Sequence, residues 1–110
     1  MLIATRLLKL RTPEAEIDIP INIFAPEEDD RAWKCSYEIH WPEGKRTSAA
    51  WGFDSVQAIL LALQKIGTDI YVSGYHKSGN LMWDKPGNGY GFPVPHNARD
   101  WLEGDDAVFF

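Results

Sequence analysis

The sequence predicts an α+β fold: a four-stranded antiparallel β-meander, one main α-helix packed on its apolar face, and an irregular Gly/Pro-rich C-terminal wrap. Two observations lead to this prediction. Four segments of the first half alternate apolar and polar residues with a period of two, which is typical of half-buried strands, and the segments are joined by short connections, which favour antiparallel neighbours. One amphipathic segment at helical spacing follows them.

The first two strands are expected over residues 2–10 and 17–23. In the first, Arg6 is the one exception on an otherwise apolar face. The second shows the cleanest alternation in the chain, but it contains Pro20. Because proline has no N–H to donate to a ladder, Pro20 must lie at an edge, at a bulge or on a non-bonded side.

The third and fourth strands are expected over residues 33–41 and 47–53, and they carry most of the aromatic residues of the predicted core. The alternation places one set of side chains toward the helix: Trp33, Cys35, Tyr37, Ile39 and Trp41 from the third strand, and Thr47, Ala49, Trp51 and Phe53 from the fourth. Cys35 is the only cysteine, so no intramolecular disulfide can form, which fits a reducing compartment. We expect Cys35 to be buried and inert.

A helix is predicted to run to Ile66, with Asp54 or Ser55 as the residue that caps its first turn. Asp54 with Gln57 three residues later resembles a capping box, and Gly67 is a natural C-terminal stop. The predicted apolar stripe consists of Val56, Ile59, Leu60, Leu63 and Ile66, and it is widened by Ala58 and Ala62.

Residues 68–110 give a weaker pattern. Residues 70–72 and 81–83 either pair as a small hairpin, or residues 69–72 continue the helical region. The prolines and glycines of residues 85–95 exclude regular structure there, and a short helix is expected from Asn97 or Ala98 to Leu102. No linker or second core is visible, so a single domain is expected over residues 1–110.

Composition excludes several classes of function. The chain has 110 residues and a net charge of −5, and an acidic balance argues against nucleic-acid binding. The longest apolar stretch, residues 58–63, is far too short to cross a membrane, which takes about 20 residues. The N-terminus does not resemble a signal peptide, so a cytoplasmic location is expected.

No motif points to catalysis, to a metal or to a cofactor. His40, His76 and His96 lack the local spacing of metal ligands, and no serine stands in a nucleophile motif. The glycines of residues 87–91 superficially resemble a phosphate-binding loop, but two prolines follow where a helix would have to begin. We therefore predict no cofactor, and the absence of such motifs favours a protein that is not an enzyme.

Two groups of residues are candidates for binding. The first is an acidic loop, in which four carboxylates suit a basic partner: Glu27, Glu28, Asp29 and Asp30. The second gathers around the Gly/Pro loop, where aromatic side chains can line a groove: Trp83, Tyr90, Phe92, His76 and His96. The apolar residues Phe109 and Phe110 dock either on the domain itself or on something else, such as a second subunit.

The order of these segments resembles a known group of proteins. The meander, then Trp51-Gly-Phe-Asp-Ser with its helix, then Leu81-Met-Trp and Gly91-Phe-Pro, is similar to small bacterial α+β proteins known only as domains of unknown function. The resemblance covers nearly the whole chain. It implies the fold and a bacterial cytoplasmic setting, and it carries over no functional residue.

Three functions remain open at this point. The first is a non-catalytic binding or protein-interaction domain. The second is a small-molecule-binding protein or an unrecognised enzyme with its site near residues 87–92. The third is a homodimeric structural protein, joined through the first or second strand as an exposed edge. The expected partners are thus a protein, a small ligand or a second copy of the chain, and neither nucleic acid nor a membrane.

Overall fold

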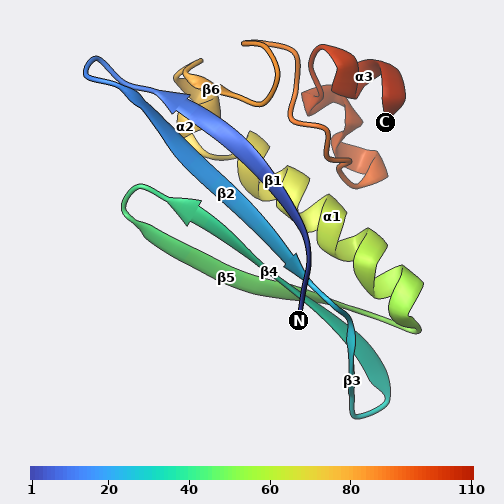
Figure 1. Ribbon diagram of the computed structural model, residues 1–110. Coiled ribbons are helices and arrows are strands. Elements are labelled where there is room, and N and C mark those ends of the chain that lie inside the picture. The colour runs from blue at the N-terminus through green and yellow to red at the C-terminus, as the bar shows by residue number, and fades with distance from the viewer.

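The computed structural model describes residues 1–110, and its fold is α+β with an antiparallel sheet and one main helix (Figure 1). The helix crosses one face of the sheet, and the C-terminal residues gather beside it at one end of the molecule. The elements in chain order are β1 (Leu2–Arg11), β2 (Glu16–Phe24), β3 (Glu27–Asp29), β4 (Ala32–Trp41), β5 (Gly44–Gly52), α1 (Ser55–Tyr71), α2 (Gly74–Lys77), β6 (Leu81–Met82), the 3-10 helix η1 (His96–Trp101) and α3 (Asp105–Phe109).

The sheet has six strands where the sequence predicts four. Its order is β3-β4-β2-β1-β6, with β5 on the other side of β4. The four long strands β1, β2, β4 and β5 are successive antiparallel neighbours, as the short connections predict. The two additional strands are short: β3 forms a hairpin with β4, and β6 pairs with β1 only at Lys9 and Leu10. Both form in segments without the alternation that reveals longer strands.

The acidic segment is therefore a hairpin rather than a loop. Glu27, Glu28 and Asp29 pair with β4, and the turn is completed by Asp30, whose φ of 59° lies in the left-handed region that aspartate tolerates. All four side chains are exposed, and the hairpin projects from the end of the sheet farthest from the C-terminal helices (Figure 1).

Helix α1 begins where the sequence predicts and ends five residues later. The Asp54 side chain accepts a hydrogen bond from the Gln57 N–H at 2.8 Å, which confirms the predicted cap. Gly67 does not stop the helix. A Cβ at Gly67 would stand 1.9 Å from the carbonyl oxygen of Pro93, so glycine is needed there for close approach of the loop that follows β6. The helical alternative for residues 69–72 is thus correct to Tyr71, and the predicted hairpin with residues 81–83 is wrong because β6 pairs with β1.

The buried face of α1 is narrower than the predicted stripe. Ala58, Ala62, Ile66 and Ile70 are fully buried against the sheet, whereas Val56 and Leu60, both predicted to face the core, are exposed. The two alanines let the helix approach the strands closely, and the larger aliphatic residues are displaced to the flank. No helix of the chain is both long and apolar enough to cross a membrane.

Strand β5 presents the opposite face from the one predicted. Its residue Ala50 pairs with buried Cys35, so Ala50 and Gly52 face the helix, while Trp51 and Phe53 are exposed. The reason is space: a Cβ at Gly52 would lie 2.4 Å from the backbone nitrogen of Ala58. A tryptophan cannot occupy that face, and the Trp51 indole instead donates to Asp29 on the outer surface at 3.0 Å.

The rest of the core agrees with the predicted faces. Cys35 is buried and unpaired with any other cysteine, and Tyr37 and Ile39 beside it are fully buried. Trp33 and Trp41 pack partly buried at the margin of the core. Pro20 stands opposite Leu7 and outside residues 21–23, which pair with β4, so it interrupts no ladder bond on that side.

The outer face of the sheet carries an ionic cluster at Glu38. Its carboxylate lies 3.1 Å from both the His40 Nε2 and the Lys45 Nζ, and the Asn22 amide donates to it at 3.3 Å. Hydrogen bonds from His40, Lys45 and Asn22 together lower the pKa of Glu38 to about 2 from its ordinary value of 4.5.

The first prediction concerns Gly67. The change Gly67→Ala should lower the free energy of unfolding by about 1–3 kcal/mol, because the new methyl group forces the Pro93 carbonyl away from the helix. Urea unfolding measures it. Gly74→Ala is the matched control, since it is also helical and a Cβ there meets nothing within 4 Å. Equal stability of the two variants would contradict the close approach.

The second prediction concerns pH. Because the folded-state pKa of Glu38 lies below its unfolded value, its contribution to stability is complete above about pH 4.5 and is lost as the pH falls toward 2. Glu38→Gln should therefore be less stable than the unaltered chain at pH 7 and equally stable near pH 2. Thermal unfolding of both proteins across this range checks it. A stability difference that does not change with pH would contradict it.

Candidate ligand pocket at Arg6

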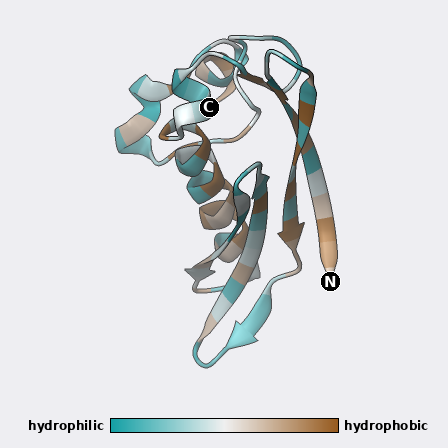
Figure 2. Ribbon diagram, turned by 90° about the vertical axis from the view of Figure 1, so that its left-hand side faces the viewer, coloured by the Kyte–Doolittle hydropathy of each residue, from teal (hydrophilic) through white to brown (hydrophobic).

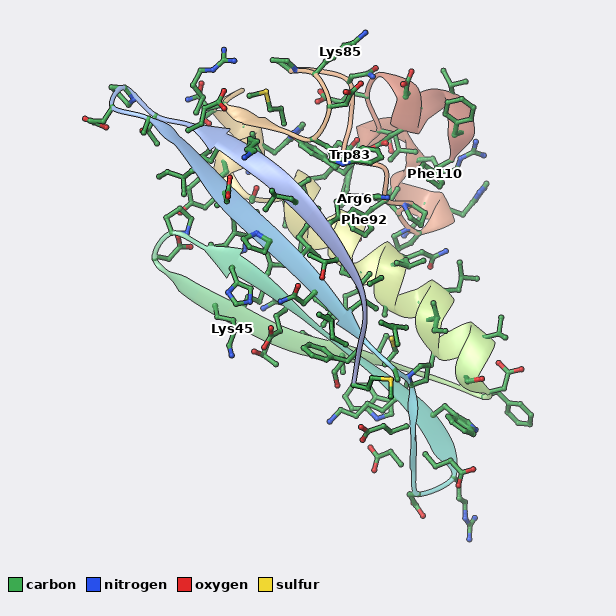
Figure 3. All side chains as sticks on the ribbon, viewed as in Figure 1. Arg6, Lys45, Trp83, Lys85, Phe92 and Phe110 are labelled. Carbon is green, nitrogen blue, oxygen red and sulfur yellow. The ribbon has the colours of Figure 1, made fainter.

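Arg6 is the exception in the apolar pattern of the first strand, and the structure explains it. The Arg6 side chain points to the inner side of the sheet, where its guanidinium carbon lies 3.9 Å from the ring centroid of Trp83 and 4.8 Å from that of Phe92 (Figure 3). Its Nη1 donates to the carbonyl oxygen of Gly91 at 2.7 Å and to that of Tyr90 at 3.3 Å. Burial lowers the pKa of Arg6, an effect that the negative charge of Asp106 partly opposes.

Glycine at position 91 makes this arrangement sterically possible. Its φ is 75°, and a Cβ there would lie 2.5 Å from the Trp83 ring and 2.6 Å from Nη1 of Arg6. Any side chain would therefore separate the loop from the guanidinium. The Gly/Pro loop predicted to lack regular structure is thus held in one conformation by a strand residue some 80 positions earlier in the chain.

Asp106 holds the same loop from the other side. Only 2% of this residue is exposed, and its carboxylate accepts hydrogen bonds from the backbone N–H groups of Tyr90 and Gly91, each at 2.8 Å, and from the Tyr71 hydroxyl at 2.5 Å. A buried carboxylate needs such donors to offset the loss of water. Asp106 therefore fixes the carbonyls that Arg6 binds.

A cavity of about 620 Å³ opens beside the guanidinium. Aromatic rings and carboxylates share its wall, which includes Arg6, Trp83, Asp84, Asp105, Phe109 and Phe110. The Nε and Nη2 groups of Arg6 donate to no group of the chain, and no buried side-chain nitrogen or oxygen is left without a partner, so these N–H groups are open to solvent. The cavity thus offers unused donors at a half-buried cation.

A second cavity of about 480 Å³ adjoins the first and shares Arg6 and Phe110 with it. Its wall is more apolar, with Leu60 and Leu63 of α1 facing Ala4 of β1. The flank residues displaced from the helix stripe therefore line a groove between the helix and the first strand.

His76 belongs to a separate cluster behind the loop. Its Nδ1 lies 2.6 Å from the Tyr90 hydroxyl, and its ring meets those of Tyr71 and Tyr90 edge to face. Burial raises the pKa of both tyrosines well above the ordinary value, so both phenols remain protonated and serve as hydrogen-bond donors. This cluster joins α1 and α2 to the loop.

The structure brings together some of the predicted binding residues and separates others. Trp83 and Phe92 touch Arg6, and Tyr90 and His76 lie directly behind them. His96 is exposed at the start of η1, with no hydrogen bond to this group, and the acidic residues 27–30 lie at the opposite end of the sheet (Figure 1). No group of three or more His, Cys, Asp or Glu residues is placed to hold a metal ion.

Sequence reasoning missed the two charged residues that organise the pocket. Arg6 could have been noticed from the sequence, because it is the one charged residue on an otherwise apolar strand face and a cation there needs a partner. Asp106 could not have been noticed in this way: it stands among other acidic residues near the C-terminus, and only the fold shows that it is buried.

Asp106 can be tested directly. Asp106→Asn should lower the free energy of unfolding by about 1–3 kcal/mol. The Asn amide has one oxygen in place of two, so it cannot accept hydrogen bonds from all three donors, which are two backbone N–H groups and the Tyr71 hydroxyl. Urea unfolding measures it, with the exposed Asp100→Asn as control. Equal stability of both variants would mean that Asp106 does not hold the loop.

Comparison with known proteins identifies the family. A family model described as a domain of unknown function (DUF6968) matches residues 4–94. Neither the curated proteins nor the solved structures yield a match. The matched range includes Arg6, Trp83 and Phe92 and ends before α3, which supplies Asp106. The chain therefore belongs to the DUF6968 family, which confirms its predicted resemblance to a domain-of-unknown-function group.

Proposed function

We propose that this chain is a non-catalytic binding domain that takes a small, flat organic ligand in the pocket at Arg6. The observation that carries the proposal is the guanidinium itself. Arg6 is half-buried against Trp83 and Phe92, but only its Nη1 is bonded within the chain. Holding the loop requires one nitrogen, and the others face an open cavity.

The walls of the pocket define the chemistry of the ligand. Trp83 is 42% exposed and offers a flat apolar surface for stacking. The Arg6 donors suit a carbonyl or ring-nitrogen acceptor. Asp84 and Asp105 at the wall suit N–H donors and repel a free anion. A neutral heterocycle of nucleobase size, with an acceptor on one edge and a donor on the other, satisfies all three.

The polar groups around the pocket support binding rather than catalysis. Asp106 accepts three hydrogen bonds from the chain itself, and the tyrosines behind the loop stay protonated. A general base must lie beside the substrate, whereas Asp106 is buried and its carboxylate serves to hold the loop. The alternative prediction is a protein partner, and it rests on the exposed carboxylates of residues 27–30.

The proposal is tested by titrating the isotope-labelled chain with uracil, cytosine, adenine and benzoate. A base should shift the indole N–H signal of Trp83 and the Nε–H signal of Arg6, whereas benzoate should not, because three carboxylates line the pocket. Trp83→Ala should weaken base binding about tenfold or more through lost stacking.

The matched control is Trp101→Ala, because Trp101 is similarly exposed, at 45%, and lies outside this pocket. It should leave the affinity for the base unchanged. Absence of any shift at Trp83 with all four probes, or equal weakening in both tryptophan variants, would overturn the pocket as a ligand site.

A further inference from the structure

The sheet has two long unpaired edges, on β5 and on β1. Strand β5 pairs only with β4. Strand β1 pairs with β2 from Leu2 to Arg11, with a register shift at Ile3, but on its other side it meets β6 only at Lys9 and Leu10. Residues 2–8 of β1 therefore form an open edge. Such an edge is a template for pairing with another strand unless the protein blocks it.

The hydrogen-bonding groups of this edge can be assigned by alternation. The Arg11 N–H donates to the Asn80 carbonyl on the β6 side at 2.9 Å. Alternate residues of a strand point their N–H and C=O to the same side, so Leu7 and Thr5 also point theirs away from β2. Leu7 stands opposite Pro20, which has no N–H to donate, in agreement with this assignment. No other part of the chain bonds to these groups.

The two open edges differ in how they are protected. The β5 edge carries Lys45 and Arg46, and Lys65 of α1 donates to the Ala49 carbonyl at 2.9 Å. Charged side chains of this kind are the usual defence of an edge.

The β1 edge has no such protection. Its one charge between Leu2 and Leu8 is Arg6, whose guanidinium is held on the inner side by Gly91. Ile3 and Leu7 are 48% and 41% exposed. The N-terminal half of this strand stands clear of the helices as an apolar ribbon (Figure 2).

We propose that a second copy of this chain pairs with the β1 edge, antiparallel and about a two-fold axis at Thr5, so that the two sheets become continuous. This register places Ile3 opposite Leu7 of the second copy and Thr5 opposite Thr5. Both are pairings that stabilise antiparallel strands. It also places Arg6 opposite the small Ala4, leaving room for the guanidinium to stay on its loop.

Charge selects this register over the neighbouring one. A shift of the axis to Arg6 keeps the backbone groups matched but sets two Arg6 residues directly opposite each other, and like charges at that position are destabilising. The register of β1 against β2 shifts between Leu2 and Ala4, so regular pairing of β1 with β2 begins at Ala4 and Ile3 stands at the bulge. The regular centre of the proposed contact is therefore Thr5 opposite Thr5, with Ala4 opposite Arg6 on either side. The match of apolar residues with apolar residues under two-fold symmetry favours a second copy over an unrelated strand.

The oligomeric state tests the proposal. Sedimentation velocity over a wide concentration range should show the full chain forming a dimer. The double variant Ile3→Lys with Leu7→Lys sets like charges opposite each other and should raise the dimer dissociation constant at least about tenfold. Both positions are exposed, so circular dichroism and the melting temperature of the monomer should be unchanged.

A charge-swapped variant tests the register itself. Ile3→Lys with Leu7→Glu in the same chain brings opposite charges together across the two-fold axis, and dimerisation should return. With the axis at Arg6 the two positions would not meet, and no rescue would follow. Val56→Lys adds a charge at an exposed apolar residue of α1 away from the edge and should leave the dimer intact.

Three results would overturn the proposal. The first is a monomer at every concentration, which would also leave the edge open to an unrelated strand. The second is a dimer that the double lysine variant does not weaken, and the third is equal weakening by Val56→Lys. None of these results bears on the Arg6 pocket, whose test rests on Trp83 and Trp101.

Discussion

The architecture of the pocket depends on one guanidinium held at the inner face of a β-strand. Arg6 binds two loop carbonyls, and the adjacent loop N–H groups are bound in turn by the buried carboxylate of Asp106. The two ions do not pair directly within hydrogen-bonding distance; each satisfies its charge through the loop backbone between them. A segment without regular structure thereby acquires a defined conformation, and residues at both ends of the chain are joined at one place.

The helix, the sheet and the C-terminal loop approach one another closely at three glycines. Gly52, Gly67 and Gly91 each stand where a Cβ would collide with backbone or with the Arg6 and Trp83 side chains. Ala58 and Ala62 bring α1 onto the sheet. These small residues draw the layers together and force large apolar side chains to the margins. That explains why Trp51, Phe53 and Val56 are exposed although their sequence patterns place them inside. Leu60 and Leu63 at the flank of α1 line the groove between this helix and β1.

The polar and apolar surfaces are unevenly distributed along the molecule. One end carries the acidic hairpin, and the C-terminal helices gather at the other (Figures 1 and 2). The aromatic pocket lies beside the half-buried Arg6 and includes residues of the last helix. Of the two sheet edges, one is lined by lysine and arginine and the other by aliphatic residues. A protein that avoids edge pairing protects both edges. The asymmetry between β1 and β5 is the physical basis for proposing β1, rather than β5, as the edge that pairs with a second copy.

The sequence by itself determined the local structure: the antiparallel order of the long strands, the buried Cys35 and Tyr37, and the Asp54 cap of α1. Periodicity and capping depend on neighbours within a few residues, so these features are readable from the sequence. It also grouped Trp83 with Phe92, and the structure places both rings against Arg6. Only the tertiary structure decided which face of β5 is buried and that α1 continues past Gly67 to Tyr71. The same holds for the contacts of Arg6 and Asp106 with the loop. Each of these depends on contacts between segments distant in the chain, at distances that composition and spacing do not encode.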